Sequence, residues 1–439
     1  MIVLQSLHWL LLLAEVCLAC PVVYLCLLSI CAGIAARKKK YEQVGHDVQM
    51  STHAHFAVLI PAHNEEALLN GLLESLSQLE YPKELCTVYV IADNCSDGTT
   101  ELARRFDGVR VYERFDAEKR GKGYALHWMW QQLEESGLTY DAYLILDADS
   151  VVVPQFLEAM DKELARGAKA LQACNTVLNV ADSPSTALRW IALTLMNHVR
   201  PLGRNALGGS STLTGNGMCL SRELLQRHPW RAFGIAEDYQ YYLSIVQDGE
   251  VVRYVPEAIV RSHMPTTFHS MRTQDVRWEA AAPEQSRWRT VLRLLGTGLR
   301  RSSFVRIEAA AELLTPPLSV LVSISLLLLV ASFALVFPLA MVTGYVLLAG
   351  LACYIATPFA LLRPPRPVYR ALLHAPNFMF WKLWVYFVLS RSRKHTSEWV
   401  RTSRVPGNIS RAPGGISTAS GGKTRAPARG APTIDEAAG

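Results

Sequence analysis

The feature that most constrains the fold is an apolar stretch at the start of the chain. Residues 2–36 are almost all apolar, with Glu15 as their only charged side chain, and four basic residues, 37–40, follow directly. A helix needs about 20 apolar residues to cross a bilayer. A signal peptide instead carries its basic residues before a shorter apolar core. The stretch 1–36 is therefore predicted to be an N-terminal transmembrane helix that stays in place as an anchor.

A second apolar region lies nearer the C-terminus, and the composition agrees with a membrane protein. Of all residues, 50% are hydrophobic and 19% are charged, which is apolar for a soluble chain of this size. Residues 317–362 hold two successive apolar segments, each close to the length of about 20 residues that a span requires. We expect two transmembrane helices here, preceded by an interfacial segment at 301–316.

The basic residues predict the orientation of these spans. Residues 37–40 border the first span, and Arg363, Arg366 and Arg370 follow the last one. Because Lys and Arg gather on the cytoplasmic side of a membrane, both groups are placed there. We expect an integral protein of a bacterial cytoplasmic (inner) membrane, with the N-terminus outside and the central domain and C-terminus in the cytoplasm.

Two C-terminal segments carry separate predictions. Residues 371–393 mix aromatic and basic side chains, which favours an amphipathic helix in the membrane interface, with a fourth span as the alternative. Residues 404–439 are rich in Gly, Ala, Ser, Thr, Pro and Arg and are predicted to be a disordered basic tail. The net charge of +6 gathers near the membrane boundaries and in this tail, so we expect membrane lipids as partners and no nucleic acid.

The central residues 37–300 alternate between strand and helix patterns. Apolar strands are predicted at His55–Ile60 and Thr87–Ala92, with a helix at Glu65–Leu79 between them and a third strand at Tyr143–Leu146. This order is typical of βαβ units on a mainly parallel sheet. The fold class is therefore predicted to be an α/β domain with added transmembrane and interfacial helices.

Two aspartates follow the third predicted strand. The segment reads YLILDADS, and if the strand continues, Asp147 and Asp149 point to the same face. Ligands of open α/β sheets bind beyond the carboxyl ends of the strands. Mg²⁺ is usually held by one or two carboxylates together with substrate phosphate oxygens. The pattern therefore predicts a cation site for a phosphate-bearing substrate.

The polar loops form an ordered set. PAHNEE begins at Pro61, DNCSDGT at Asp93, RGKGYAL at Arg120 and LDADS at Leu146, and an acidic pair follows at 237–238. In this order the chain resembles family 2 glycosyltransferases, inverting enzymes of the GT-A (nucleotide-diphospho-sugar transferase) fold. They include cellulose, chitin and hyaluronan synthases and ceramide glucosyltransferase. The resemblance covers roughly residues 52–300 and the membrane arrangement.

The resemblance implies a site for a nucleotide-sugar donor, with UDP as the expected nucleotide. The first loop matches the nucleotide-binding loop, Asp93 the contact to the base, and Lys122 a lysine near the diphosphate. Asp147 matches the position near the donor sugar and ribose, and Asp149 a metal ligand. The implied donor-binding residues are Pro61, Ala62, Asn64, Glu65, Asp93, Lys122, Asp147 and Asp149.

The resemblance also implies a divalent cation, Mg²⁺ or Mn²⁺. Such an ion would stabilise the departing diphosphate as charge develops on it. Asp149 and Asp147 are the implied ligands, and His263 is a further candidate because a histidine serves in some GT-A enzymes. Read alone, an Asp-x-Asp at a strand end is more often a solvated turn.

The acidic pair Glu237 and Asp238 is the implied catalytic pair. Inversion at the anomeric carbon requires a base that takes the acceptor proton, and Asp238 matches the family's catalytic aspartate. Read alone, the pair is equally well explained as acidic residues at the start of a helix, where they are stabilising. The family often has Thr before this pair, and Ala236 stands there instead.

Two further segments are assigned to the acceptor by the resemblance. One is the small-residue stretch Gly215, Asn216 and Gly217, which a packing turn would explain equally well. The other is QDVRW, with Gln274, Arg277 and Trp278 on one face if the segment is helical. Trp278 would stack on a sugar ring and Arg277 would bind phosphate oxygens. A helix at the membrane interface is the alternative explanation of the second segment.

Three functions are consistent with these motifs. The first is a synthase that extends a β-linked polysaccharide from a UDP-sugar, with secretion through its own helices, a homo-oligomer or a partner protein. The second is a transferase that adds a single sugar to a membrane lipid. The third is a non-catalytic membrane scaffold. The QDVRW motif favours the first, the small number of spans favours the second, and the intact acidic motifs disfavour the third.

Overall fold

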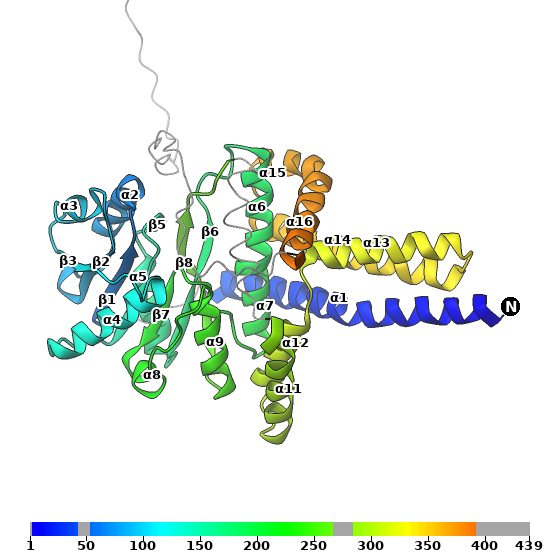
Figure 1. Ribbon diagram of the computed structural model, residues 1–439, viewed down its shortest axis with the longest axis horizontal. Helices are drawn as coiled ribbons and strands as arrows, with labels where there is room; N and C mark the ends of the chain where they lie inside the picture. Colours follow the sequence, from blue (N-terminus) through cyan, green and yellow to red (C-terminus); the bar gives the residue numbers. More distant parts are fainter. Residues whose placement is uncertain (1, 43–52, 267–283, 392–439) are drawn as a thin grey trace, which may run out of the picture. The chain divides into compact units, whose positions relative to one another are not determined.

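The computed structural model describes residues 2–42, 53–266 and 284–391 (Figure 1). Within these residues one sheet of eight strands has the order β3-β2-β1-β4-β7-β6-β8-β5. Its strands, in chain order, are β1 (Phe56–Ala62), β2 (Cys86–Asp93), β3 (Val109–Arg114), β4 (Ala142–Ile145), β5 (Ser150–Val152), β6 (Ala170–Val177), β7 (Met218–Ser221) and β8 (Val252–Ser262).

The first half of the sheet is parallel. Strand β1 pairs with β2 and β4, and β2 pairs with β3, all in parallel. Every residue of β1, FAVLIPA, is buried, because a parallel strand covered on both faces has no solvated side. The predicted strands at 55–60, 87–92 and 143–146 agree with β1, β2 and β4 to within two residues at each end. The prediction of a mainly parallel α/β sheet is confirmed.

The second half of the sheet is mixed. Strand β7 is antiparallel to both β4 and β6, β8 is parallel to β6, and β5 is antiparallel to β8. Short β5 therefore lies at the sheet edge, far in the sheet order from β4, which precedes it by four residues. The turn between them carries the two aspartates of YLILDADS.

Helices cover both faces of the sheet. On one face the buried core packs against α2 (Glu66–Ser77), α3 (Thr99–Ala103) and α5 (Phe156–Ala165). On the other face it packs against α4 (Lys122–Glu135), α8 (Arg222–Arg227), α9 (Glu237–Gln247), α11 (Glu284–Arg300) and α12 (Phe304–Leu314). The 3-10 turn η1 (Lys83–Leu85) leads into β2. The helix predicted at 65–79 is α2.

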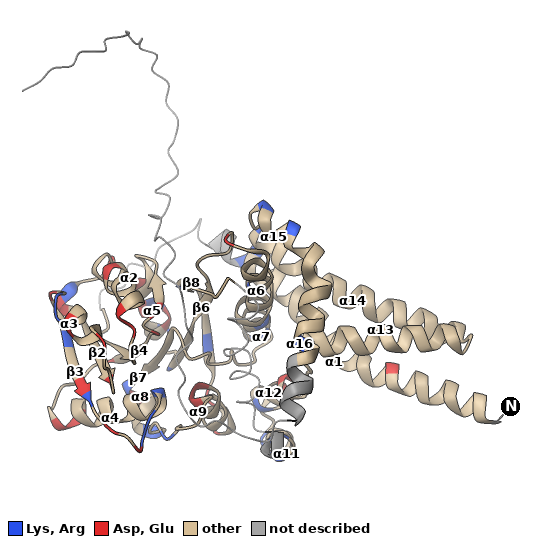
Figure 2. Ribbon diagram, turned by 45° about the horizontal axis from the view of Figure 1, so that its top comes forward, with Lys and Arg blue, Asp and Glu red and all other residues tan. Residues whose placement is uncertain are grey.

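A third core joins the sheet domain to long apolar helices. It contains buried residues of α1 (Ile2–Glu42), α6 (Pro184–Thr194), the π-helix η2 (Leu195–Val199), α13 (Leu318–Ala334), α14 (Pro338–Leu362) and α15 (Arg366–Ala371). Helix α7 (Arg200–Ala206) packs against α1, and α1 also contacts α13 and α14. The chain continues through η3 (Leu372–His374) into α16 (Ala375–Arg391). In Figure 2 the three long helices are almost free of charge, whereas the sheet domain carries both signs.

Two helices of the described chain are long and apolar enough to cross a membrane, Val3–Lys38 within α1 and Pro338–Leu362. A third span arises if α12 and α13, which meet at a bend of 61°, are counted as one. Alone, α13 has 17 residues, short of the usual length of about 20. The expectation of three spans, one at residues 1–36 and two within 317–362, stays a prediction. The roles predicted for 301–316 and 371–393 at the interface stay predictions.

Candidate active site

The loops after β1 and β2 interlock at the carboxyl edge of the sheet. Asn64 and Asn94 both have positive φ angles, 56° and 52°, a conformation that Asn adopts more readily than most residues. The side-chain oxygen of Asn64 accepts a 2.7 Å hydrogen bond from the amide of Ser96, and the amide of Glu65 donates to Thr99 Oγ1 at 2.9 Å. Pro61 and Ala62 are buried at the end of β1. The predicted nucleotide-binding loop is therefore held in one shape.

Asp93 ends β2 as a buried carboxylate with one oxygen to spare. Arg114 Nη1 donates to its Oδ1 at 2.6 Å, while within the described residues its buried Oδ2 has no hydrogen-bond partner. Burial raises the pKa of Asp93, and the Arg114 guanidinium opposes that rise. Arg114 was not among the predicted site residues. The pairing of β2 with β3, which sets Arg114 beside Asp93, is the signal that would have found it.

The two aspartates of the DAD segment lie in a turn, which corrects the prediction that they share a face of an extended strand. Strand β4 ends at Ile145, and the amide of Ser150 donates to the carbonyl of Asp147 at 3.2 Å. A hydrogen bond from residue i+3 back to residue i closes a β-turn. The Asp147 side chain is 42% exposed. The sequence predicted the correct edge of the sheet for the two carboxylates but the wrong backbone conformation.

Lys122 connects this turn with two other parts of the chain. Its ammonium group lies 2.5 Å from Asp147 Oδ1, donates to the carbonyl of Gly215 at 2.6 Å and stands 4.0 Å from Glu237 Oε1. Burial alone would lower the pKa of Lys122, but the carboxylates of Asp147, Glu237 and Asp238 outweigh burial and raise it. Lys122 is therefore a cation among acidic groups at the start of α4.

The pair Glu237 and Asp238 opens α9 and is largely withdrawn from solvent. Asp238 Oδ1 accepts from the amide of Tyr239 at 2.7 Å. A Cβ atom built on Gly215 would lie 3.0 Å from Asp238 Oδ2, so the acidic pair packs directly against that loop. Burial and the neighbouring Asp238 raise the pKa of Glu237 to about 8. Burial also raises the pKa of Asp238, with Lys122 opposing the rise. Near neutral pH this pair holds one proton more than two free carboxylates would.

The predicted acceptor loop 215–217 is built for close packing. Gly215 and Gly217 have φ angles of 77° and 74°, and a Cβ on Gly217 would meet the Cβ of Ala173 at 2.5 Å. The buried Asn216 accepts from the amide of Asp147 at 3.1 Å and donates to Ser150 Oγ at 2.8 Å. Its amide thus holds the DAD turn in place. An acceptor contact of the loop stays a prediction.

Asp149 and His263 flank the paired ends of β5 and β8. In these antiparallel strands Ser150 pairs with Ser262, so Asp149 directly precedes and His263 directly follows the last residue pair. Among the residues that the structure describes, the buried Nδ1 of His263 has no hydrogen-bond partner. A carboxylate and an imidazole are both ligand types that divalent cations accept.

Side chains alone supply few ligands for such an ion. Over residues 2–42, 53–266 and 284–391, no group of three or more His, Cys, Asp or Glu is placed to hold a metal. Mg²⁺ commonly takes one or two protein carboxylates and fills its remaining positions with substrate phosphate oxygens and water. The residues present therefore fit a cation that arrives together with a diphosphate. Gln274, Arg277 and Trp278 lie outside the described residues.

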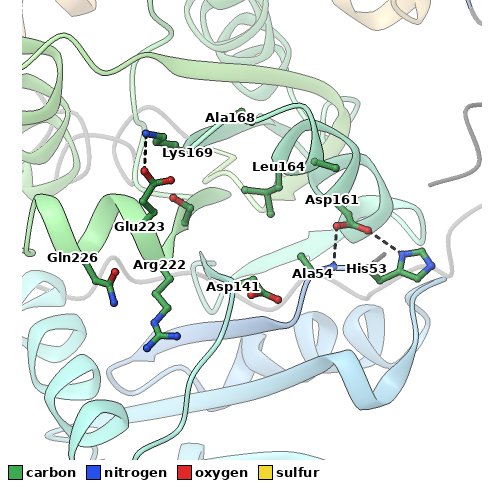
Figure 3. A pocket seen from close by; sticks show the side chains of 13 residues that line it. His53, Ala54, Asp141, Asp161, Leu164, Ala168, Lys169, Arg222, Glu223 and Gln226 are labelled. Carbon is green, nitrogen blue, oxygen red and sulfur yellow. Dashed lines mark hydrogen bonds and ion pairs between the residues drawn. The ribbon is translucent and has the colours of Figure 1, made fainter. Parts of the chain in front are cut away.

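A hollow of about 680 Å³ lies away from these groups (Figure 3). It is lined by residues that precede β1, β4 and β6, at the amino ends of those strands, among them Ala54, Asp141 and Lys169. Asp161 pairs with His53 at 3.0 Å, and Lys169 pairs with Glu223 at 2.9 Å. Ligands of open α/β sheets bind at the opposite, carboxyl ends. The hollow is therefore no part of the candidate active site.

Two relatives match about half of this chain. At 26% identity it matches "Probable glycosyltransferase YdaM" of Bacillus subtilis over 51% of this chain and 54% of that protein. At 27% identity it matches a "Beta-monoglucosyldiacylglycerol synthase" of Trichormus variabilis over 51% of this chain and 47% of that protein. The matched segment thus spans about half the length of these relatives.

A solved structure shares the fold. The mannosyltransferase PcManGT of Pyrobaculum calidifontis superposes with a TM-score of 0.50 at 15% identity, covering 89% of this chain and 100% of that one. The sequence model of the family described as "Glycosyltransferase like family 2" matches residues 53–281, just over half of the 439 residues. That segment contains every site residue described above. The chain therefore belongs to family 2 of the glycosyltransferases and has their GT-A fold.

Proposed function

We propose that the protein is a membrane-bound inverting glycosyltransferase that moves one sugar from a nucleotide-diphosphate donor, a UDP-sugar, to a lipid acceptor. The observation that carries the proposal is the meeting of three elements at one point. Lys122 contacts both Asp147 and Gly215, and Asp238 packs against Gly215. A donor-side acidic turn and a second acidic pair, of which Glu237 is buried, thus share one lysine and one loop.

The donor side is assigned to the polar groups at the carboxyl edge of the sheet. The unpartnered oxygen of Asp93 would accept a hydrogen bond from the nucleotide base, and the loop from Pro61 to Glu65 would lie along the nucleoside. Asp149, His263 and Asp147 would hold Mg²⁺ or Mn²⁺ with the diphosphate. When bound, such an ion neutralises the charge that develops on the leaving diphosphate. Lys122 adds a positive charge on the same side.

Asp238 is assigned as the base that takes the proton of the acceptor hydroxyl. Its raised pKa makes it a stronger base than an exposed aspartate, which favours proton transfer near neutral pH. Because burial and Asp238 raise the pKa of Glu237 to about 8, that neighbour retains its proton at pH 7 more readily than a free carboxyl group does. The hydroxyl then attacks the anomeric carbon from the face opposite the diphosphate, which inverts its configuration.

A lipid acceptor is supported by the relatives and by the number of spans. Two of the matched proteins, from Trichormus variabilis and from Nostoc sp., are named beta-monoglucosyldiacylglycerol synthases, and that name denotes a glycolipid product. Two or at most three spans among the described residues provide little material for a polysaccharide channel. We infer that the acceptor site opens toward the cytoplasmic leaflet.

The test is product analysis with the full-length protein. It would be placed in vesicles that contain diacylglycerol and incubated with Mn²⁺ and labelled UDP-glucose, UDP-galactose, UDP-N-acetylglucosamine or GDP-mannose. The expected result is one labelled lipid that carries a single sugar. A labelled polymer would instead identify a polysaccharide synthase, and background label with every donor would contradict an active enzyme.

A further inference from the structure

A buried polar network lies where α1 meets the helices of the catalytic domain. Arg204 on α7 binds Glu308 on α12 through two hydrogen bonds, Nε to Oε1 at 2.5 Å and Nη2 to Oε2 at 3.0 Å. Tyr24 on α1 donates to Glu308 Oε1 at 2.7 Å. Arg204 Nη2 also donates to the hydroxyl of Tyr242 on α9 at 2.9 Å. Four helices that are distant in sequence thus meet through four side chains.

The network extends along α7 and α12 by a second ion pair. Arg200 Nη1 lies 3.0 Å from Glu312 Oε1, and Arg200 Nε donates to the hydroxyl of Tyr354 on α14 at 2.8 Å. The hydroxyl of Tyr24 lies 3.2 Å from Glu312 Oε2 and so bridges both glutamates. Two arginines and two glutamates balance in charge, and both apolar helices α1 and α14 take part.

Burial of this network costs free energy, because charged groups lose their contact with water. Arg204 is 1% exposed and Glu308 is 3% exposed. The desolvation of a buried ion pair largely cancels its attraction, so apolar residues of the same size often stabilise a fold equally well. Where buried ion pairs have a purpose, the best-attested one is to fix a single arrangement of the elements that carry them. What this network fixes is the position of α9 relative to α7, α12 and α1.

The position of α9 matters because Asp238 lies in its first turn. Tyr242 follows Asp238 by four residues, so both side chains lie on the same face of the helix, one turn apart. The hydrogen bond from Arg204 therefore holds α9 one turn from the proposed base. A displacement of about 1 Å at a catalytic group can cost a factor of 100 in rate.

We propose that Arg204 and Tyr242 are positioning residues for Asp238, and that the chain Tyr24, Glu308, Arg204 and Tyr242 sets the catalytic helix from the membrane anchor. The inference rests on the proposed function, because it takes Asp238 as the base. It goes beyond that function because it makes the rate of proton transfer to Asp238 depend on the hydroxyl group of Tyr24 on α1.

The test compares two tyrosines of α9. Tyr242→Phe removes the hydroxyl that Arg204 binds and keeps the ring. Tyr241→Phe is the matched control, because Tyr241 is equally buried, with both at 2% exposure, and its hydroxyl donates to the carbonyl of His228 at 2.8 Å, outside the network. Both variants lose one hydrogen bond of a tyrosine hydroxyl, so a purely structural role would lower their melting temperatures and their activities alike.

The expected result is a split between the two steady-state constants. With the sugar nucleotide of highest turnover among UDP-glucose, UDP-galactose, UDP-N-acetylglucosamine and GDP-mannose, Tyr242→Phe should lower kcat about tenfold. The donor KM should stay within about twofold, because the donor loops are untouched. Tyr241→Phe should keep the wild-type kcat. Equal kcat values for the two variants would overturn the positioning role.

The link to α1 is tested by Tyr24→Phe and by the double variant with Tyr242→Phe. Tyr24→Phe should lower kcat in the same direction, and the double variant should lose less than the product of the two single losses, because residues of one network are not additive. Independent, multiplying losses would contradict a single chain of contacts.

A measurement without activity keeps the two proposals apart. Hydrogen exchange of the α9 amides, in the full-length chain in detergent, should speed up in Tyr24→Phe and in Tyr242→Phe near residues 238–243, because α9 is then held less firmly. Unchanged exchange would overturn the link from α1. If the wild type turns over none of the four donors while exchange behaves as expected, the proposed function fails and the link stands.

Discussion

Two acidic pairs lie at the candidate active site, and the side chains of Asp147 and Glu237, one from each pair, differ in solvent access. Asp147 and Asp149 lie in a turn at the carboxyl edge of the sheet, with the Asp147 side chain 42% exposed. Glu237 and Asp238 begin a helix packed on the sheet, with the Glu237 side chain 10% exposed. Carboxylates that remain solvated stay charged and suit a hydrated cation and a diphosphate. Carboxylates that are buried hold protons more tightly and suit proton transfer.

Lys122 is what the two pairs have in common. It lies 2.5 Å from Asp147 Oδ1 and 4.0 Å from Glu237 Oε1, and it also interacts electrostatically with Asp238, so one cation limits the repulsion among these three acids. The residues of the site are far apart in the sequence. Residues 122, 147 and 237 come from three separate motifs, and only the fold brings the start of α4, the turn after β4 and the start of α9 together.

The largest effect is expected at Asp238, the proposed base. Asp238→Asn removes the base and keeps its shape, so transfer should fall by about 1,000-fold. Donor binding should persist, because the acidic turn is unchanged. Sugar transfer with labelled donor measures the loss. A variant that transfers at a near-normal rate would remove Asp238 from the mechanism.

The next effect is expected at the acidic turn that carries Asp147 and Asp149. Asp149→Ala should lower transfer by about 100-fold, because the proposed metal ion would stabilise the leaving diphosphate. His263→Ala should weaken the response to Mn²⁺ by about tenfold, as loss of a lesser ligand or neighbour does. Rates measured against Mn²⁺ concentration provide the check. Full activity of the wild type in excess chelator would show that transfer does not require a metal ion.

A smaller effect is expected at the residue between the pairs. Lys122→Met removes its ion pair with Asp147 and its hydrogen bond to Gly215, so kcat/KM should fall about tenfold. Lys162→Met is the control, because Lys162 pairs with Glu158 on the exposed side of α5 and should leave activity unchanged. Equal activity of the two variants would mean that Lys122 is a structural cation only.

The smallest effect is a pH dependence of stability from Glu237. Its pKa is about 8 in the folded protein and ordinarily 4.5, so between these pH values the folded state holds more protons than the unfolded state. The free energy of unfolding should therefore fall as pH rises from about 5 to 8. Glu237→Gln should flatten this part of the curve of melting temperature against pH. Parallel curves for both proteins would show that Glu237 titrates normally.

Much of the donor side could be predicted from the sequence, because its signals are local. Strands β1, β2 and β4 are short apolar runs that end in polar loops, and each loop follows its strand directly. The family resemblance assigned Asn64 and Asp93, which lie in two of these loops, to the donor, and the structure brings the two loops together. The backbone of the DAD segment was predicted wrongly, because the alternation of a strand was extended past Ile145 into a turn.

The remainder depends on contacts between distant segments. Arg114 was missed because only the β2–β3 register brings it to Asp93. The pairing of Arg204 with Glu308 joins residues 104 positions apart, and no local pattern marks either one. The 61° bend between α12 and α13 also left no clear trace beyond two prolines, Pro316 and Pro317.

The most direct test of the division of labour is calorimetric titration of UDP, with and without Mn²⁺, into two full-length variants. Asp238→Asn should bind UDP as the wild type does and keep the enhancement by Mn²⁺, because its acidic turn is intact. Asp149→Ala should lose that enhancement. Two results would contradict the assignment of the metal to Asp149 and of the base role to Asp238. One is an Asp149→Ala variant that still binds UDP more tightly with Mn²⁺. The other is an Asp238→Asn variant whose UDP binding Mn²⁺ does not enhance.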